Sequence, residues 1–209
     1  MTNVNGFALP RLYPITDARL AKLSHAEQVK RFIEGGATLI QLREKHASPR
    51  DFYRDAEAAL RIAHARGARL IINDRADIAF ALKADGVHLG QDDLPPEAAR
   101  ELLGREAIIG FSTHNIDQAV DARRLPIDYL AIGPVFTTSS KENPDPVVGI
   151  EGLRRVRLAV ADLPLVAIGG MTLDRARQAL AAGADSVACI SELLASTETI
   201  EERTRKLLG

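Results

Sequence analysis

Short apolar runs alternate along the chain with segments in which apolar residues recur at helical intervals. Eight runs have the character of buried strands, and they cover residues 11–17, 38–45, 69–75, 86–93, 107–114, 129–136, 165–170 and 186–191. Helical spacing is clearest in residues 24–36 and 48–67. Strands that are apolar on both faces and joined by helices are typical of a parallel sheet.

The segments between the strands carry start and stop signals for helices. Ser24 can cap the first of them, with Gly35 or Gly36 at its end, and Ser48 precedes a second one that starts with Pro49. Eight strand and helix units in about 200 residues predict a single-domain (β/α)₈ TIM barrel over residues 1–209. A doubly wound open sheet is the alternative.

The second run, residues 38–45, changes from apolar to charged as it ends. Because side chains alternate along a strand, Gln41, Arg43 and Lys45 share one face, while Leu42 and Glu44 share the other. A strand end that runs into solvent would explain this pattern. A cationic face that points into the mouth of a barrel would explain it equally well, because TIM barrels place their active sites at the C-terminal ends of the strands.

Charged residues at other strand ends favour the second explanation. Asp74 and Asp93 follow neighbouring strands and offer hard oxygen ligands without His or Cys, which suits Mg²⁺, although either residue could instead cap the next helix. Arg43, Lys45 and Lys141 would bring positive charge to the same mouth. A metal and three cations predict a polyanionic substrate, and a diphosphate fits better than a carboxylate.

The last two runs end differently, with Gly169-Gly170 and with Ile190-Ser191. Backbone N–H groups at such positions hold monophosphates in many barrels. We therefore expect a second anion site and two phosphorylated small-molecule substrates. His114, near the end of the fifth run, could serve either acid–base chemistry or structure.

Composition excludes some classes of function. Lys and Arg total 27 against 28 Asp and Glu, and no basic run is present, so we do not expect a nucleic-acid partner. No apolar run approaches about 18 residues and no leader is recognised, so we expect a cytoplasmic protein that does not cross a membrane. Cys189 lies in an apolar run and is expected to be buried rather than nucleophilic. Residues 137–149 form the longest irregular stretch and are expected to be a lid or a binding loop.

Six motifs in order resemble those of the thiamine-phosphate synthases, over nearly the whole chain. They are QLREK (41–45), INDR (72–75), DGVHLGQDD (85–93), GFSTH (110–114), IGPVFTTSSK (132–141) and AIGG (167–170). The resemblance implies a Mg²⁺-dependent transferase on a (β/α)₈ barrel. Its reaction would join hydroxymethylpyrimidine diphosphate to a thiazole phosphate, in its phosphate or carboxylate form, giving thiamine phosphate and pyrophosphate.

The same resemblance assigns roles to individual residues. Asp74 and Asp93 would bind Mg²⁺, and Ser112 would meet the pyrimidine. The residues implied to hold the pyrimidine diphosphate are Gln41, Leu42, Arg43, Glu44, Lys45, Asn73 and Lys141. Those implied for the thiazole phosphate are Thr138, Ser140, Gly170, Ile190 and Ser191, and Ser139 is also expected to bind substrate. Arg43, Lys45, Lys141 and Ser112 would be catalytic. The family usually has a second Thr where this chain has Ser140, and the serine keeps the hydroxyl group.

Two other functions fit parts of the pattern. A related thiazole tautomerase would use a His for proton transfer and would not need a diphosphate clamp. A barrel that only binds thiamine phosphate would need no catalytic groups, whereas Asp74, Asp93 and Lys141 are all present in this chain. The sequence does not indicate an oligomeric state.

Overall fold

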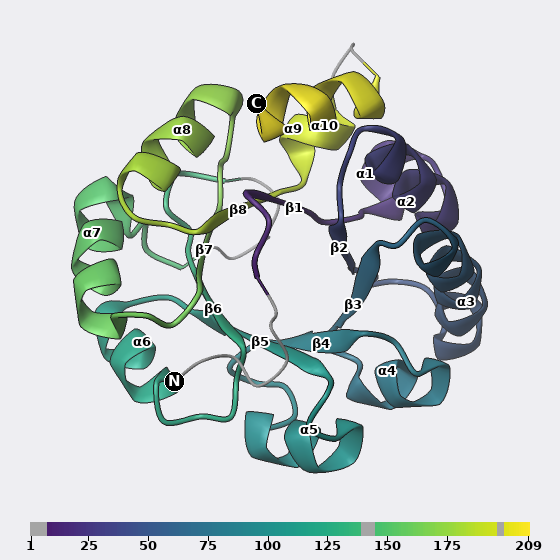
Figure 1. The fold of residues 1–209 in the computed structure, drawn as a ribbon, viewed down its shortest axis with the longest axis horizontal. Coiled ribbons are helices and arrows are strands. Elements are labelled where there is room, and N and C mark those ends of the chain that lie inside the picture. The colour runs from purple at the N-terminus through teal and green to yellow at the C-terminus, as the bar shows by residue number, and fades with distance from the viewer. Residues whose placement is uncertain (1–7, 139–144, 196–198) are drawn as a thin grey trace.

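Each of the eight apolar runs contains a parallel strand in the computed structural model, which describes residues 8–138, 145–195 and 199–209. The strands are β1 (Leu12–Pro14), β2 (Leu39–Leu42), β3 (Arg69–Asn73), β4 (Gly86–Leu89), β5 (Ile108–Thr113), β6 (Tyr129–Ile132), β7 (Leu165–Ile168) and β8 (Ser186–Cys189). Figure 1 shows them around a common axis, with the helices outside. The predicted TIM barrel is confirmed, and the open sheet is excluded.

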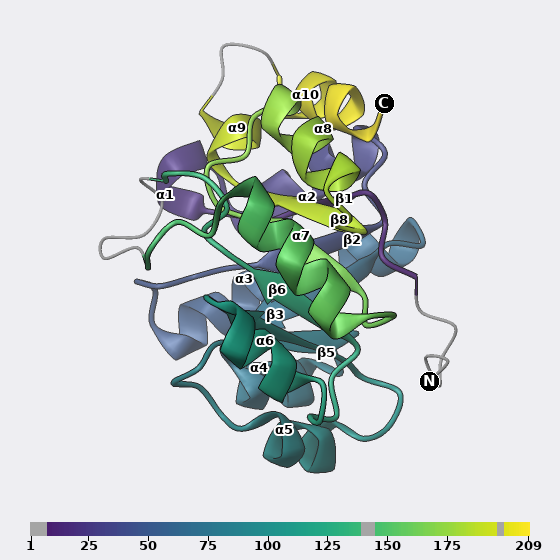
Figure 2. The ribbon, with the colours of Figure 1, turned by 90° about the vertical axis from the view of Figure 1, so that its left-hand side faces the viewer.

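The helices of the described residues follow the strands in turn. They are α1 (Ala18–Ala21), α2 (His25–Glu34), α3 (Pro49–Ala65), α4 (Ala76–Leu82), α5 (Pro96–Leu103), α6 (Ile116–Ala122), α7 (Gly149–Val160), α8 (Leu173–Ala181), α9 (Ser191–Leu194) and α10 (Ile200–Leu208). Figure 2 shows them from the side of the barrel. Within the described ranges, every helix is too short or too polar to span a bilayer.

The predicted caps are present. The Ser24 hydroxyl accepts a hydrogen bond from the N–H of Glu27, and the Ser48 hydroxyl accepts one from Asp51. Gly35 ends α2, as expected. The four-residue helices α1 and α9 were not predicted, because four residues are too few to show an apolar period.

The barrel closes between its first two strands. β1 pairs in parallel with β8 over three residues, Leu12 opposite Val187 being the first pair. On its other side β1 meets β2 through a bridge between Ile15 and Gln41, supported by a 2.9 Å hydrogen bond from the Thr16 N–H to the Gln41 carbonyl. Because the sheet returns to its first strand, all eight strand ends gather at one mouth.

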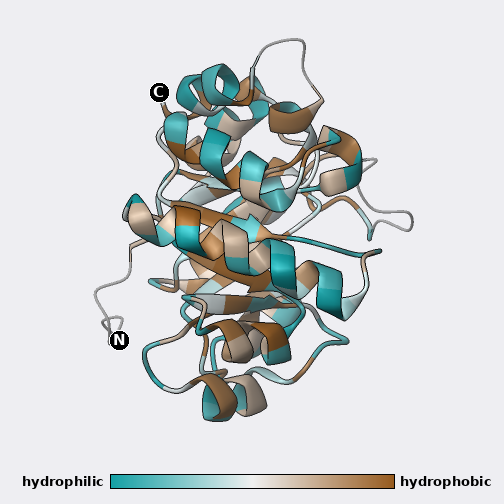
Figure 3. Cartoon of the chain, turned by 90° about the vertical axis from the view of Figure 1, so that its right-hand side faces the viewer, coloured by the Kyte–Doolittle hydropathy of each residue, from teal (hydrophilic) through white to brown (hydrophobic). Residues whose placement is uncertain are grey.

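Two layers of apolar side chains fill the molecule. The outer layer lies between the strands and the helices, and Figure 3 shows hydrophobic residues interspersed with hydrophilic ones along the helices. The inner layer fills the barrel and consists of Tyr13, Ile15, Leu39, Ile71, Ile108, Tyr129, Ala131, Val166 and Ala188. Leu9 packs against this inner layer. The alternation along the strands thus gives every strand except β4 a residue in both layers, and β4 contributes Val87 and Leu89 to the outer layer alone.

Candidate functional site

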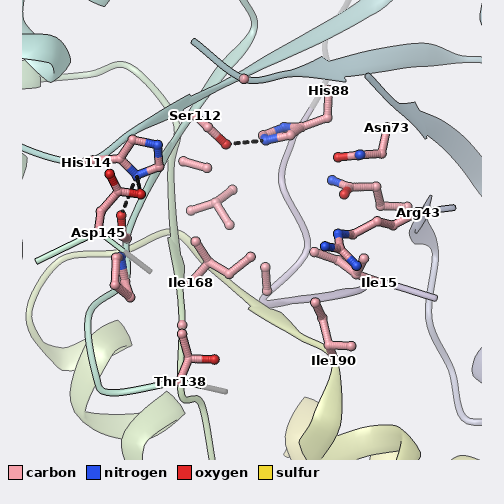
Figure 4. Close-up of a pocket in the computed structure, with 18 of the residues that line it drawn as sticks. Ile15, Arg43, Asn73, His88, Ser112, His114, Thr138, Asp145, Ile168 and Ile190 are labelled. Carbon is pink, nitrogen blue, oxygen red and sulfur yellow. Dashed lines mark hydrogen bonds and ion pairs between the residues drawn. The ribbon is translucent and has the colours of Figure 1, made fainter. Parts of the chain in front are cut away.

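A pocket of about 590 Å³ is lined by residues from the C-terminal ends of the strands and the loops that follow them. Figure 4 shows that its labelled side chains come from several strands and converge on one space. Most of the residues singled out from the sequence line it. They are Gln41, Arg43, Lys45, Asn73, Asp74, Asp93, Ser112, His114, Thr138, Gly170, Ile190 and Ser191.

Three residues singled out from the sequence lie outside the described residues. They are Ser139, Ser140 and Lys141. The described part of the loop after β6 ends at Thr138, which lines the pocket, and begins again at Asp145, which also lines it. The chain therefore approaches the pocket on both sides of this segment.

The charged end of β2 points into the pocket, as the alternation predicted. Gln41, Arg43 and Lys45 line it, and the Arg43 guanidinium lies 3.6 Å from a carboxylate oxygen of Asp17. Lys45 forms an ion pair with Asp74. The interpretation of a strand end that merely runs into solvent is therefore wrong.

Leu42 and Glu44 are not among the residues that line the pocket, and their assignment to the substrate stays a prediction. Leu42 faces the other side of the strand and is buried in the outer apolar layer. Glu44 turns away as well, and its carboxylate accepts hydrogen bonds from the N–H groups of His46 and Ala47 at 2.6 and 3.0 Å. The resemblance had taken the QLREK motif as one block, whereas only alternate residues of a strand share a face.

Glu44 instead holds the loop after β2. Its carboxylate also lies 3.2 Å from Nε2 of His25, the first residue of α2. Burial raises the pKa of Glu44, but the two N–H donors and His25 outweigh it and lower that pKa to about 2. On the far side of the same ring, His25 Nδ1 lies 2.7 Å from the Thr16 hydroxyl, which accepts a hydrogen bond from the Arg43 N–H. This cluster fixes the backbone from which Arg43 extends.

Replacing Glu44 by glutamine is expected to lower the free energy of unfolding by about 2 kcal/mol near pH 7, because an uncharged amide accepts these N–H bonds more weakly. The folded-state pKa of Glu44 lies below its ordinary value of 4.5. The contribution of ionised Glu44 to the free energy of unfolding is therefore present above about pH 4.5, and it is lost as the pH falls towards 2. Urea unfolding at pH 7 and at pH 3 measures both effects.

A matched control is Glu57→Gln, which removes an exposed pair with Arg61 on α3. It should change the stability by less than about 1 kcal/mol at either pH. A Glu44→Gln deficit that is the same at pH 7 and pH 3 would contradict the assignment.

Asp74 and Asp93 form a carboxylate pair at the ends of β3 and β4. Neither caps the following helix, because α4 and α5 have no side-chain cap. Burial is the largest influence on the pKa of Asp93 and raises it. A 2.7 Å hydrogen bond from the Gly90 N–H lowers this pKa, whereas contact with the Asp74 carboxyl group raises it further. Asp74 adopts a left-handed conformation with φ 62°, which is uncommon for a non-glycine residue.

This pair suits a divalent cation that keeps most of its water. Two carboxylates in contact repel each other unless a proton or a cation lies between them. Among the described residues no group of three or more His, Cys, Asp or Glu side chains could hold a metal. Further ligands would have to be water or substrate oxygens, as Mg²⁺ sites commonly use.

A chain of buried hydrogen bonds crosses the barrel below this pair, and the sequence analysis missed most of it. Ser112 Oγ lies 2.8 Å from His88 Nε2, and His88 Nδ1 lies 3.0 Å from the Tyr129 hydroxyl. The Tyr129 hydroxyl lies 2.8 Å from that of Tyr13, which accepts a 3.2 Å hydrogen bond from the Gln41 side-chain amide. A polar His within the apolar strand 86–89 was the one available signal.

Burial dominates the protonation of this chain. It lowers the pKa of His88 to about 4, although the negative charge of Asp74 acts in the opposite direction. It also raises the pKa values of Tyr13 and Tyr129. Near pH 7 the imidazole and both phenols are therefore neutral.

The opposite side of the pocket is built from backbone. Gly170 has φ 62°, and a Cβ atom there would lie 2.3 Å from the carbonyl oxygen of Thr137. Ile190 precedes α9, whose first residue is Ser191. Thr138, Gly170, Ile190 and Ser191 all line this side. Exposed N–H groups at a turn and at a helix start can receive an anion.

The two remaining candidates have structural explanations. His114 Nδ1 donates to the carbonyl of Gly133 at 2.8 Å and lies 3.4 Å from the carboxylate of Asp145. Figure 4 shows His114 and Asp145 side by side. Its bond to a backbone carbonyl favours the structural alternative. Cys189 is 1% exposed, and burial raises its pKa to about 12, so it is a buried strand residue as predicted.

Comparison with known proteins shows similarity along most of the chain. The sequence profile described as "Thiamine monophosphate synthase" matches residues 12–193. The thiamine-phosphate synthase of Koribacter versatilis is 49% identical over 197 residues, covering 91% of this chain and 92% of the relative. That of Chloroflexus aurantiacus is 43% identical over 189 residues, covering 90% and 87%.

A solved structure agrees with the sequence relatives. The thiamine phosphate pyrophosphorylase from Pyrococcus furiosus superposes with a TM-score of 0.84 at 38% identity. The match covers 94% of this chain and 93% of that one. Sequence and fold therefore indicate the same family.

Proposed function

The chain belongs to the thiamine monophosphate synthase family, and on this premise we propose that it joins hydroxymethylpyrimidine diphosphate to a thiazole phosphate, in its phosphate or carboxylate form. The products are thiamine phosphate and pyrophosphate, and a substrate in the carboxylate form must also release carbon dioxide. One observation carries the proposal. A single pocket has cations and a carboxylate pair on one side, and a turn and a helix start on the other.

The β2 and β3 side of the pocket is the proposed diphosphate end. Arg43 offers a planar fork that matches phosphate oxygens, and Lys45 offers a point charge beside it. Asn73 lies on the neighbouring strand and lines the same side. Lys141 is proposed to join these cations. Its position in the sequence, between the pocket-lining residues Thr138 and Asp145, supports this role.

Asp74 and Asp93 would hold Mg²⁺ at this end. When bound there, Mg²⁺ supplies positive charge to phosphate oxygens as negative charge builds up on the leaving group. The like-charge contact between the two carboxyl groups, which helps to raise the pKa of Asp93, supports the assignment. Lys45, paired with Asp74, would also be close enough to share the diphosphate.

The reaction needs no protein nucleophile. The bond between the pyrimidine methylene carbon and the diphosphate oxygen breaks, and its electron pair leaves with pyrophosphate. The aminopyrimidine stabilises the resulting cation, and the lone pair of the thiazole nitrogen then forms the new carbon–nitrogen bond. Arg43 and Lys45 stabilise the departing charge, and Ser112 and Gln41 hold the ring in line for attack.

The opposite side of the pocket is the proposed thiazole phosphate end. Gly170, Ile190 and Ser191 would present backbone N–H groups, and Thr138 would add a hydroxyl group. Ser139 and Ser140 are proposed to extend this set of hydroxyl groups. A neutral site of this kind binds a monophosphate without a metal.

A turnover assay tests the proposed function. Purified protein is incubated with both substrates and Mg²⁺, and thiamine phosphate and pyrophosphate are measured separately. Equal amounts of the two products are expected, with none when either substrate is omitted. Isomerisation of the thiazole alone would identify the tautomerase, and binding without any product would identify a protein that only binds its ligand.

A further inference from the structure

The proposed thiazole phosphate end of the pocket has a cation behind it, the guanidinium of Arg175 in the first turn of α8. Arg175 Nη1 donates a 2.8 Å hydrogen bond to the carbonyl oxygen of Gly170. We propose that this bond fixes the peptide between Gly170 and Met171, so that the Met171 N–H becomes a donor to a monophosphate. Arg175 is then a positioning residue, because it is not among the residues that line the pocket. That the monophosphate is thiazole phosphate rests on the proposed function, whereas the orientation of the peptide does not.

The direction of the Met171 N–H follows from the geometry of the peptide. Among the described residues the one cis peptide bond is Gly133-Pro134, so the bond between Gly170 and Met171 is trans. In a trans peptide the C=O and N–H groups point in opposite directions. The carbonyl points to Arg175, outside the pocket lining, whereas Gly170 and Met171 both line the pocket. The Met171 N–H is therefore directed to the pocket side of the turn.

The preceding peptide is held in the same way. The carbonyl of Gly169 accepts a 3.2 Å hydrogen bond from the N–H of Phe136, so the Gly170 N–H points away from Phe136. Successive N–H groups in such a turn form a concave site for an anion. In the part of the chain that the structure describes, the N–H groups of Gly170 and Met171 have no hydrogen-bond acceptor. Two adjacent donors are thus left for a ligand.

Arg175 matters because a glycine turn has more than one orientation open to it. Gly170 can adopt conformations of either sign of φ, so rotation of the Gly170–Met171 peptide would exchange its N–H and its carbonyl at the pocket. A carbonyl oxygen carries partial negative charge and would repel phosphate oxygens. A hydrogen bond from a charged donor is about twice as strong as a neutral one and holds the carbonyl on the far side. The guanidinium also adds positive charge behind a lining that is itself neutral.

Further contacts hold Arg175 in place. Its guanidinium carbon lies 4.9 Å from the centroid of the Phe136 ring, which is a cation–π contact. Its backbone N–H donates to the hydroxyl group of Thr172, the residue that caps α8. The adjacent carboxylate, that of Asp174, pairs with Arg177 at 3.6 Å instead. The charge of Arg175 is therefore directed to the turn and to the loop after β6.

Selective nitrogen-15 labelling of methionine tests the orientation of the peptide directly. The chain has two methionines, Met1 and Met171, so the Met171 amide signal is identified by its loss in Met171→Leu. Inorganic phosphate is titrated in EDTA near pH 7. We expect the Met171 amide proton to move downfield and to saturate, because a hydrogen bond to an oxyanion deshields it. A signal that does not respond to phosphate would overturn the proposal.

Two matched variants on α8 test the role of the guanidinium. Arg177 is exposed and lies two residues beyond Arg175 on the same helix. Arg175→Leu should remove most of the Met171 shift and weaken phosphate binding about tenfold or more, the weight of one hydrogen bond from a charged group. Arg175→Lys keeps the charge and a donor, so it should restore part of the binding. Arg177→Leu should change neither quantity.

Kinetics separates positioning from general damage to the fold. Arg175 supports the phosphate of the thiazole equally in the ground state and in the transition state. Arg175→Leu should therefore raise KM for thiazole phosphate about tenfold and change kcat by less than about twofold. Mg²⁺-dependent binding of pyrophosphate should be unaffected. An equal loss of both ligands, or the same rise of KM in Arg177→Leu, would contradict the proposal.

The outcomes also separate this inference from the proposed function. A Met171 signal that responds to inorganic phosphate only when Arg175 is present, in a protein that forms no thiamine phosphate, would support the inference and overturn the function. Turnover by a protein whose Met171 signal ignores phosphate would do the reverse. If Arg175→Leu does not fold, the wild-type titration and Arg175→Lys decide.

Discussion

Replacing Asp93 by asparagine is expected to lower kcat about a thousandfold while leaving the protein folded and at least as stable. A metal that stabilises a leaving group contributes several kcal/mol, and each 1.4 kcal/mol is about tenfold in rate. Asparagine keeps an oxygen for the Gly90 N–H, so the loop after β4 should survive. The measurement is turnover against Mg²⁺ concentration for the wild type and the variant.

Stability provides a second measurement that does not need activity. Because the folded-state pKa of Asp93 is raised, its contribution to stability is present at low pH and is lost as the pH rises through that pKa. In EDTA the wild type should therefore lose stability with rising pH, and Mg²⁺ should restore it. Asp93→Asn should show neither effect.

The matched control is Asp117→Asn in the first turn of α6. Asp117 is exposed, and this change should leave the Mg²⁺ dependence unaltered. Wild-type turnover that is undiminished in excess EDTA would falsify the assignment of Asp74 and Asp93 to a metal.

Replacing Gly170 by valine is expected to weaken the binding of thiazole phosphate by about a hundredfold or more. The φ of 62° disfavours a β-branched residue, and the added Cβ atom would lie 2.3 Å from the Thr137 carbonyl oxygen. Two factors of ten correspond to about 2.8 kcal/mol, which strain and crowding together readily exceed. Calorimetric titration with thiazole phosphate and with pyrophosphate measures the two ends of the pocket separately.

Metal dependence distinguishes the two ends further. Pyrophosphate binding should require Mg²⁺ and should persist in Gly170→Val, whereas thiazole phosphate binding to the wild type should be the same in Mg²⁺ and in EDTA. Gly67→Val is the control for backbone strain, because Gly67 has φ 70° but no atom within 4 Å of an added Cβ. Competition of both ligands for one site would contradict the division of the pocket.

The sequence predicted the features that depend on local periodicity. The face shared by Gln41, Arg43 and Lys45 follows from the two-residue period of a strand, and it lines the pocket. Ser24 and Ser48 cap their helices, because capping depends on residues within one turn. The repeat of strand and helix likewise predicted a closed barrel.

Features that depend on closure of the barrel were not predictable in this way. Tyr13 and Tyr129 are 116 residues apart, and their hydroxyl groups meet only inside the barrel. Glu44 was assigned to the substrate through the resemblance of the QLREK motif, and its contact with His25 was not foreseen because the packing of α2 brings that residue near. In each case the missing information is a contact between distant segments.

The pairing of β1 with β8 also determines the order in which the pocket can be completed during synthesis. β1 is the first of the strands to leave the ribosome, but its partner β8 is the last. Their three-residue ladder pairs Leu12–Pro14 with Val187–Cys189. The backbone pairing of β1 with β2 is one bridge in the described residues, between Ile15 and Gln41, so the longer ladder of β1 forms only when β8 has been translated. Tyr13, which links Gln41 to the rest of the buried chain, is carried on this strand. A nascent chain that stops before β8 should therefore fold its central strands and helices first, and the polar interior of the barrel should assemble last.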